Sequence, residues 1–129
     1  MTSPDTEYGA RNWAKTHPLL TSIAGRAFFR MPAGEPAFPL ITVNQIDGVT
    51  EDNGIDHIRL TFEVWGQNKK SASDVKRSLC TALARCVDVQ LDGDTYVYYV
   101  DDVFSTWQYD NEAELARYVV DATFHVRAG

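Results

Sequence analysis

The sequence predicts an α+β fold in which a mostly antiparallel β-sheet carries helices on one face. Three observations predict it. Residues 57–65 alternate between apolar and polar side chains, as in a strand with one buried face. From Ser71 onward, apolar residues recur every three or four positions, as on a helix that packs against a sheet. The order helix, strands, helix, strands then fits a mostly antiparallel sheet.

The first helix is expected over residues 4–15, with Ser3 as its cap and Pro4 at the first helical position. Pro18 disfavours helical geometry in the residue before it, and it can itself open a short second helix over residues 19–24. The residues of the first helix that we expect to face inward are Tyr8, Ala10, Trp13 and Ala14.

A short strand over residues 26–30 should follow, and then a connector in which proline and glycine prevent a central strand. The next strand is expected over residues 40–46. It leads into a polar loop, 47–56, that would form the long tip of a hairpin with the strand 57–65. Loops of that length are more often functional than structural.

The main helix should begin at Ser71, with Ser71 or Ser73 as its cap. Its inward stripe is expected to consist of Val75, Leu79, Ala82, Leu83 and Cys86. Cys80 and Cys86 lie too far apart along this helix for a disulfide, and we expect both to be buried apolar residues.

Two further strands are expected after the main helix. Residues 95–100 are rich in aromatic and branched side chains, and a bulge at Asp101 and Asp102 would let the strand continue. Residues 115–126 alternate again and leave one polar face. The tyrosines of residues 95–100 fit either packing on the sheet or a face left for another subunit.

Length and composition fit a single domain over residues 1–129. A chain of this size buries about two-thirds of its unfolded surface, so it needs neither a metal nor a disulfide to fold. With no signal peptide and no long apolar run, it is expected to be a soluble cytoplasmic product without membrane contact.

The net charge of −6 is unevenly distributed. Residues 47–56 carry four carboxylates and no basic side chain, whereas residues 57–87 carry six basic and two acidic side chains. Residues 86–116 contain no Lys or Arg. These segments are either ordinary solvated loops or surfaces placed against a charged partner. Tight nucleic-acid binding is disfavoured, because no basic and aromatic cluster forms a groove for phosphates.

No residue pattern calls for catalysis. His17, His57 and His125 are scattered without the spacing of metal ligands. Asp101 and Asp102 are neighbours on a strand and would point to opposite faces. No nucleophile motif and no glycine-rich phosphate loop is present. We therefore expect no enzyme activity, no metal and no cofactor.

The order of elements resembles that of the tail terminator, or tail completion, proteins of long-tailed bacteriophages. The resemblance covers nearly the whole chain. It begins with a helical turn that ends near a glycine (17–26), a strand (28–32) and a proline-rich approach to a second strand (36–43). An alternating strand (59–66) with its helix (73–79) and a final alternating strand (117–124) follow.

The resemblance implies a ring, usually a hexamer, at the tail–neck junction of a virion that is assembled in the host cytoplasm. Such a ring caps the head-proximal end of the tail tube, stops its polymerisation and offers a surface for head–tail joining. Its partners would be further copies of the chain, the tail tube protein and the head-completion or stopper protein. DNA would pass through without specific binding.

The charged residues then become candidate contacts. Candidate ring or partner contacts are Arg59, Glu63, Lys69, Lys70, Lys76, Arg77 and Arg85. Candidate lumen or interface residues are acidic, because carboxylates repel phosphates; they are Asp47, Glu51, Asp52, Asp56, Asp101 and Asp102. The hairpin tip and the loop 66–70 should touch neighbouring rings. Two alternatives stay open: a head-completion or stopper neck protein, and a small cytoplasmic ligand-binding or enzymatic α+β domain.

Overall fold

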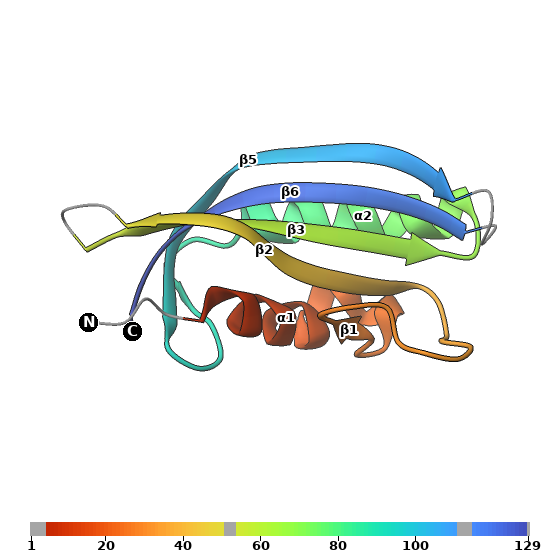
Figure 1. Ribbon diagram of the computed structural model, residues 1–129, viewed down its shortest axis with the longest axis horizontal. Helices are drawn as coiled ribbons and strands as arrows, with labels where there is room; N and C mark the ends of the chain where they lie inside the picture. The colour runs from red at the N-terminus through yellow and green to blue at the C-terminus, as the bar shows by residue number, and fades with distance from the viewer. Residues whose placement is uncertain (1–4, 51–53, 111–114, 129) are drawn as a thin grey trace.

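One curled sheet of six strands organises the molecule, with the helices on one of its faces (Figure 1). The computed structural model describes residues 5–50, 54–110 and 115–128. The helical elements are α1 (Thr6–Thr16), η1 (Pro18–Ile23) and α2 (Lys69–Ala84). The strands are β1 (Ala27–Phe28), β2 (Leu40–Thr50), β3 (Asp56–Gly66), β4 (Val89–Gln90), β5 (Thr95–Asp110) and β6 (Leu115–Ala128). Their order in the sheet is β1-β2-β3-β6-β5-β4, and of these described strands only β1 and β2 pair in parallel. The expected α+β architecture is confirmed.

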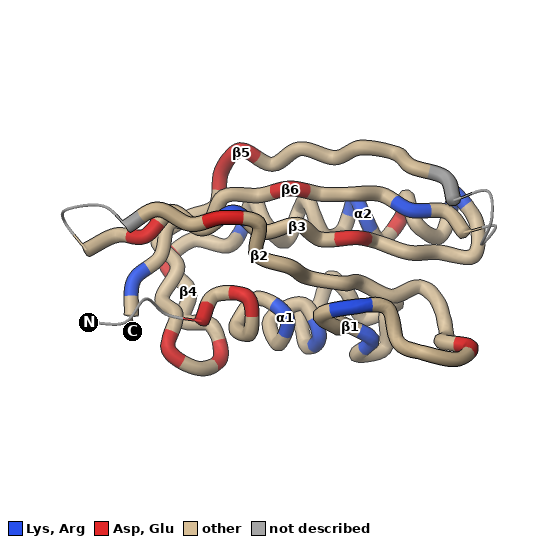
Figure 2. The backbone as a smooth tube through the Cα atoms, in the orientation of Figure 1, with Lys and Arg blue, Asp and Glu red and all other residues tan. Residues whose placement is uncertain are grey.

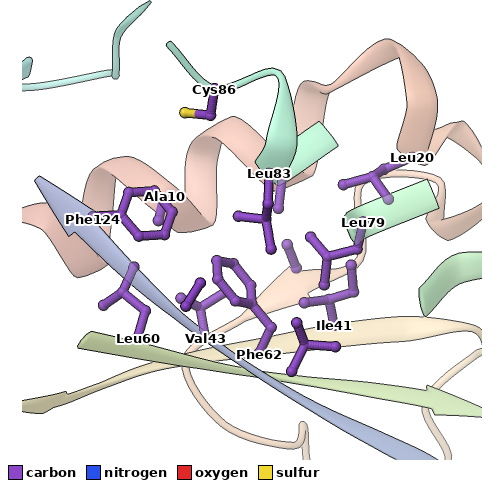
Figure 3. Packing of buried hydrophobic residues seen from close by; sticks show 14 of the residues in the cluster. Ala10, Leu20, Ile41, Val43, Leu60, Phe62, Leu79, Leu83, Cys86 and Phe124 are labelled. Atoms are coloured by element: carbon purple, nitrogen blue, oxygen red, sulfur yellow. The ribbon is translucent and has the colours of Figure 1, made fainter. Parts of the chain in front are cut away.

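The core lies between the sheet and the helices, as the two periodicities predict. Along β3, Leu60, Phe62 and Val64 are fully buried, while Arg59, next to Leu60, is exposed. The expected stripe of α2 is buried as well, and Figure 3 shows Leu79 and Leu83 packed above Phe62. Burying one such large apolar side chain stabilises the fold by roughly 1.5–3 kcal/mol. This layer holds β3 and β6 in place from one side and leaves their other side free of helices.

The start of α1 differs from the expectation. Asp5 is the cap, because its carboxylate accepts a hydrogen bond from the backbone N–H of Tyr8 at 3.0 Å. The expected cap Ser3, and Pro4 at the expected first helical position, lie outside the described residues. Ala10 and Ala14 are buried as expected, but Tyr8 is 42% exposed, so its inward placement is wrong. Tyr8 lies about 200° around the helix from Ala10 and therefore points away from the sheet.

The segment after α1 is helical, and the strand that follows is short. In η1 the Nδ1 atom of His17 accepts a hydrogen bond from the backbone N–H of Leu19 at 3.0 Å, and the turn ends at Ala24 with φ 51°. The strand β1 has only two residues, fewer than the expected five. The chain leaves the sheet at Phe29, where the ring packs under the guanidinium group of Arg11 instead of continuing beside β2.

The hairpin of β2 and β3 is longer, and its tip shorter, than the sequence predicts. The expected loop 47–56 is wrong, because β2 continues to Thr50, which lies opposite Asp56 of β3. A bulge between Gln45 and Asp47 shifts the register on the way. The hairpin projects beyond the helices (Figure 1), and residues 44–49 of β2 are all exposed, so this part of the sequence shows no alternation.

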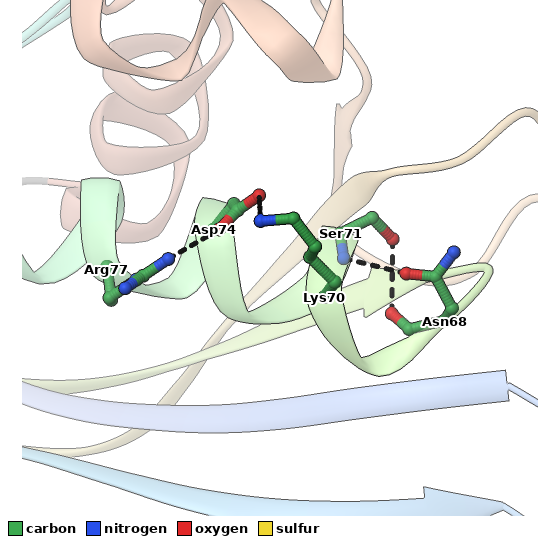
Figure 4. Close-up of polar contacts among 5 residues, drawn as sticks. All are labelled: Asn68, Lys70, Ser71, Asp74 and Arg77. Carbon is green, nitrogen blue, oxygen red and sulfur yellow. Dashed lines mark hydrogen bonds and ion pairs between the residues drawn. The ribbon is translucent and has the colours of Figure 1, made fainter.

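The cap of α2 is Asn68, so the prediction of Ser71 or Ser73 is wrong (Figure 4). Asn68 Oδ1 accepts a hydrogen bond from the backbone N–H of Ser71 at 2.9 Å, and Ser71 Oγ donates to the carbonyl oxygen of Asn68 at 3.1 Å. A Cβ atom at Gly66 would lie 2.5 Å from Ser71 Oγ. This glycine therefore lets the helix begin directly after β3, two residues earlier than expected.

The bulge expected in β5 is present. Asp101 lies opposite Thr123, whereas Phe104 lies opposite Asp121, so the register shifts between them. Asp102 takes φ 50° within this bulge. The strand bends here and then runs along β6 to its end (Figure 1). The last strand, β6, inserts between β3 and β5 and thereby joins the two halves of the sheet.

Candidate functional site

The face of the sheet opposite the helices is the first candidate surface, and we call it the outer face. Strand pairing arranges its side chains in rows that cross four strands. The rows are Leu40–Trp65–Arg117–Gln108, Thr42–Glu63–Val119–Thr106, Asn44–Thr61–Asp121–Phe104, Asp47–Arg59–Thr123–Asp101 and Val49–His57–His125–Tyr99. Neighbouring side chains of one row lie close enough to interact. The outer face is therefore a polar surface with an aromatic row at one end.

Contacts within the chain occupy the centre of the outer face. Arg117 Nη1 lies 3.0 Å from Glu63 Oε2, and the guanidinium carbon lies 4.8 Å from the centre of the Trp65 ring. Thr61 Oγ1 donates a hydrogen bond to Asp121 at 2.7 Å. The side chains of Arg117 and Glu63 are both about a quarter exposed, so this ion pair is shielded more than a surface pair. These contacts fix the positions of the polar groups on the sheet.

The aromatic row contains a histidine cluster that sequence reasoning missed. The His125 side chain is almost buried, its ring stacks on Tyr99 at 4.1 Å, and its Nε2 atom lies 2.8 Å from Asp101 Oδ1. The ring of His57 meets it edge-on at 4.3 Å. The two histidines stand on the polar faces of β3 and β6, and a prediction that these strands pair would have brought them together.

A pocket of about 490 Å³ opens at this cluster. Its lining combines aliphatic, aromatic, imidazole and carboxylate groups from Ile55, His57, Asp88, Tyr98, Tyr99 and His125. Within the described ranges, no group of three or more His, Cys, Asp or Glu side chains is placed to hold a metal ion. None of the described helices is long and apolar enough to cross a membrane.

The candidate contacts on β3 lie on the outer face and have partners in their own chain. Arg59 Nη1 is 3.8 Å from Asp47 Oδ2, and both side chains are about half exposed. Glu63 is held by Arg117. The structure thus pairs a predicted basic contact, Arg59, with a predicted acidic one, Asp47.

The candidate contacts on α2 lie on the opposite side of the sheet. The ammonium groups of Lys69 and Lys76 stand over sheet aromatics, at 4.9 Å from Trp107 and 5.1 Å from Tyr118. Asp74 holds Lys70 and Arg77. Because the candidates of β3 and of α2 lie on opposite sides of the sheet, the seven candidates do not form one surface. Lys70 Nζ lies 3.3 Å and Arg77 Nη2 lies 2.5 Å from the Asp74 carboxylate. Hydrogen bonds from Arg77 and Lys70 lower the pKa of Asp74. Arg85 is exposed at the carboxyl end of α2.

The acidic candidates divide between exposed and buried positions. Asp47 and Asp101 lie in the same row of the outer face, and Asp102 is exposed in the bulge beside them. Asp56 is only 4% exposed, so it is poorly placed to line a lumen. The other two candidates, Glu51 and Asp52, lie outside the described residues.

The sheet has an open edge on each side. The short strand β1 pairs only with Ile41 and Thr42 of β2, and β4 pairs only with Tyr96 and Val97 of β5. Within the described residues, the rest of each outer edge has no strand partner, although the backbone N–H of Gln45 donates to Glu7 at 2.7 Å. Large apolar side chains are exposed along both edge strands, among them Phe104 at 63% and Val49 at 62%. Such edges readily pair with another chain.

Comparison with known proteins identifies the fold. No protein-family model matches this chain, and no curated protein sequence matches it. Among solved structures, it is similar to a chain of the structure described as "Virion of native gene transfer agent (GTA) particle". The TM-score is 0.68 at 13% sequence identity, and the alignment covers 96% of each chain. The chain therefore shares its fold with a component of that virion.

Proposed function

We propose that this chain is a structural protein of a phage-like virion and acts as a tail terminator. In this function it forms a ring, a hexamer, on the head-proximal end of the tail tube, stops polymerisation of the tube and provides the surface for head–tail joining. The observation that carries the proposal is the similarity of fold, over 96% of both chains, to a chain of a gene transfer agent virion. The resemblance of its element order to tail terminator proteins points in the same direction.

The two open edges of the sheet support ring formation. The edge of β2 and the edge of β5 lie on opposite sides of the sheet, so a contact between them joins copies head to tail. A head-to-tail contact that closes yields a ring. The ring must match the axial face of the tube on one side and present a different face on the other. The second face cannot recruit another tube ring, and growth stops there.

The charges of the outer face support free passage of DNA. Arg59 and Arg117 each lie beside a carboxylate of their own chain. A lumen wall made of this face attracts phosphates weakly, because its central cations are already neutralised. In the proposed ring, the row with Asp47 and Asp101 lines the lumen. The hairpin tip and the segment 66–70 contact neighbouring rings.

Deletion of the gene in a particle-producing strain tests the assigned role. A terminator predicts overlong tails in electron micrographs, because growth of the tube no longer stops. A stopper predicts tails of normal length on heads that lose DNA. Complementation with the wild-type gene is the control. Particles of normal form and infectivity after deletion would overturn both roles.

A matched pair of variants tests the ring. Phe104 stands on the open edge of β5, whereas Val87 is 51% exposed in the link between α2 and β4. We expect Phe104→Lys to reduce ring formation in negative-stain micrographs and native mass spectra, and Val87→Lys to leave it unchanged. A stable monomer that binds a small molecule in the pocket of His57 and His125, and forms no ring with tail tubes, would instead establish the ligand-binding alternative.

A further inference from the structure

A second pocket, of about 510 Å³, lies beside α1 where the chain leaves β1. Its lining combines the rings of Phe28 and Phe29 with the guanidinium groups of Arg11 and Arg30. The guanidinium carbon of Arg11 lies 4.8 Å from the centre of the Phe29 ring, which orients the group by a cation–π contact. The pocket is therefore both apolar and basic.

Among the described residues, the two arginines of this pocket lack carboxylate partners. Neither Arg11 nor Arg30 forms an ion pair with any residue in the described part of the chain. The Nε atom of Arg11 is buried without a hydrogen-bond acceptor there. The neighbouring Arg26 differs, because it donates to the carbonyl oxygen of Pro39 at 3.0 Å. A guanidinium group binds a carboxylate through two parallel hydrogen bonds, so these arginines favour an anionic occupant.

The opposite end of α1 carries the complementary charge. The turn between β4 and β5 exposes Asp92 and Asp94, and no Lys or Arg occurs in residues 86–116. Asp94 Oδ1 accepts a hydrogen bond from the backbone N–H of Asp5 at 3.0 Å, which holds the turn against the start of the helix. Figure 2 shows acidic segments at this end of α1 and basic segments toward β1.

We infer that the basic pocket beside α1 receives the acidic β4–β5 turn of a second copy of this chain. One copy does not join its own two ends, because the 11-residue helix α1 holds them roughly 16 Å apart. Asp92 of a second copy instead lies against Arg30 of the first copy. The pocket of the second copy stays open for the turn of a third copy. The pocket flanks the open edge of β2 and the turn flanks that of β5. The inference rests on the proposed assembly of copies and names the charges that join them.

Charge reversal on each side tests the contact. Arg30→Glu and Asp92→Arg change exposed side chains with no ion-pair partner in the described part of the chain, so both variants should fold. We expect each variant alone to self-associate about tenfold more weakly than wild type in sedimentation velocity at low salt. An equimolar mixture should regain association, because every contact in an alternating assembly again joins opposite charges. Lys15→Glu, on the exposed side of α1, is the matched control and should have a smaller effect.

A cross-link provides the second measurement. Ala33 lines the pocket, so a mixture of Ala33→Cys and Asp92→Cys variants should form an intermolecular disulfide under mild oxidation, and neither variant alone should do so. Rings that assemble equally well from wild type, Arg30→Glu and Asp92→Arg would overturn this contact and leave the terminator role standing. Wild-type protein that stays monomeric up to about 1 mM would also overturn it. Loss of the terminator role itself appears separately, as tails of normal length after gene deletion.

Discussion

His125 Nε2 lies 2.8 Å from Asp101 Oδ1 across neighbouring strands, at the residue where β5 enters its bulge. Asp101 and Thr123 form the last regular pair before the register shifts, and the next residue, Asp102, takes a left-handed conformation with φ 50°. Beyond it, Phe104 returns to the outer face opposite Asp121. The bulge thus decides which side chains β5 presents on its open edge.

Substitutions at Asp102 test the strain in this bulge. A branched residue is disfavoured at positive φ, so Asp102→Val should lower the free energy of unfolding by about 1–2 kcal/mol. Asp102→Gly should keep or slightly raise it, because glycine adopts this conformation without a steric cost. Urea unfolding followed by circular dichroism measures both. Equal loss in the two variants would show that the aspartate side chain, and not the backbone, is responsible.

Substitutions at two phenylalanines distinguish a core position from a position on the open edge. Phe62 is fully buried under α2, so Phe62→Ala should lower the free energy of unfolding by about 3–5 kcal/mol. Phe104 is 63% exposed, and Phe104→Ala should change monomer stability by less than about 0.5 kcal/mol. Thermal unfolding at a concentration too low for assembly gives the comparison. A large loss for Phe104→Ala under those conditions would contradict its assignment to an open edge.

The start of α2 gives a third prediction. Asn68→Ala removes the cap of the backbone N–H of Ser71 and should lower the free energy of unfolding by about 1 kcal/mol. Ser73→Ala is the matched control, because Ser73 lies inside the helix, and it should cause a much smaller change. If Ser73→Ala proved the more damaging of the two in denaturant titrations, the helix would begin later than described.

The cysteines give a prediction about pH. Burial raises the pKa of the Cys86 thiol from 9.0 to about 12, and it also raises the pKa of the half-buried Cys80. At pH 8 the Cys86 thiolate fraction is therefore about one in ten thousand, so iodoacetamide should modify Cys80 first and Cys86 only in denaturant. Mass spectrometry of time points distinguishes the two sites. Rapid modification of Cys86 in the folded protein would contradict its burial.

The same shift has a consequence for stability. Because the pKa of Cys86 is higher in the folded state than in the unfolded state, its contribution to stability is fully present below pH 9 and is lost as the pH rises from 9.0 to about 12. Cys86→Ala removes this dependence. Between pH 9.0 and about 12, the free energy of unfolding of the wild type should therefore fall more steeply with pH than that of Cys86→Ala.

The elements that the sequence predicts well are those with one buried face. In β3 and α2 the side chains that meet the core differ in polarity from their neighbours, and the period shows directly in the sequence. In the outer part of the hairpin, residues 44–49 of β2 are all exposed and so give no periodic signal. The strand β1 is too short to show one.

The surfaces that we propose as functional depend on contacts between distant residues. Arg59 meets Asp47 because β2 and β3 pair, but His57 meets His125 only because β6 inserts beside β3. Local patterns indicate strands and not the order in which they pair. The sequence therefore indicated the acidic and basic segments but not the rows that they form.

The central position of β6 determines how the chain must fold. Its neighbours β3 and β5 cannot complete the sheet until this late segment, Leu115–Ala128, has entered between them. The pairing of β3 with β6 therefore closes a long loop, from Gly66 to Leu115, whereas β2–β3 and β5–β6 join consecutive strands. Closing such a long loop slows folding. During synthesis, β3 retains an unpaired edge until β6 has left the ribosome. Premature association of nascent chains through that edge competes with folding, and the open edges of β2 and β5 become competent for assembly only after the C-terminal strand is in place.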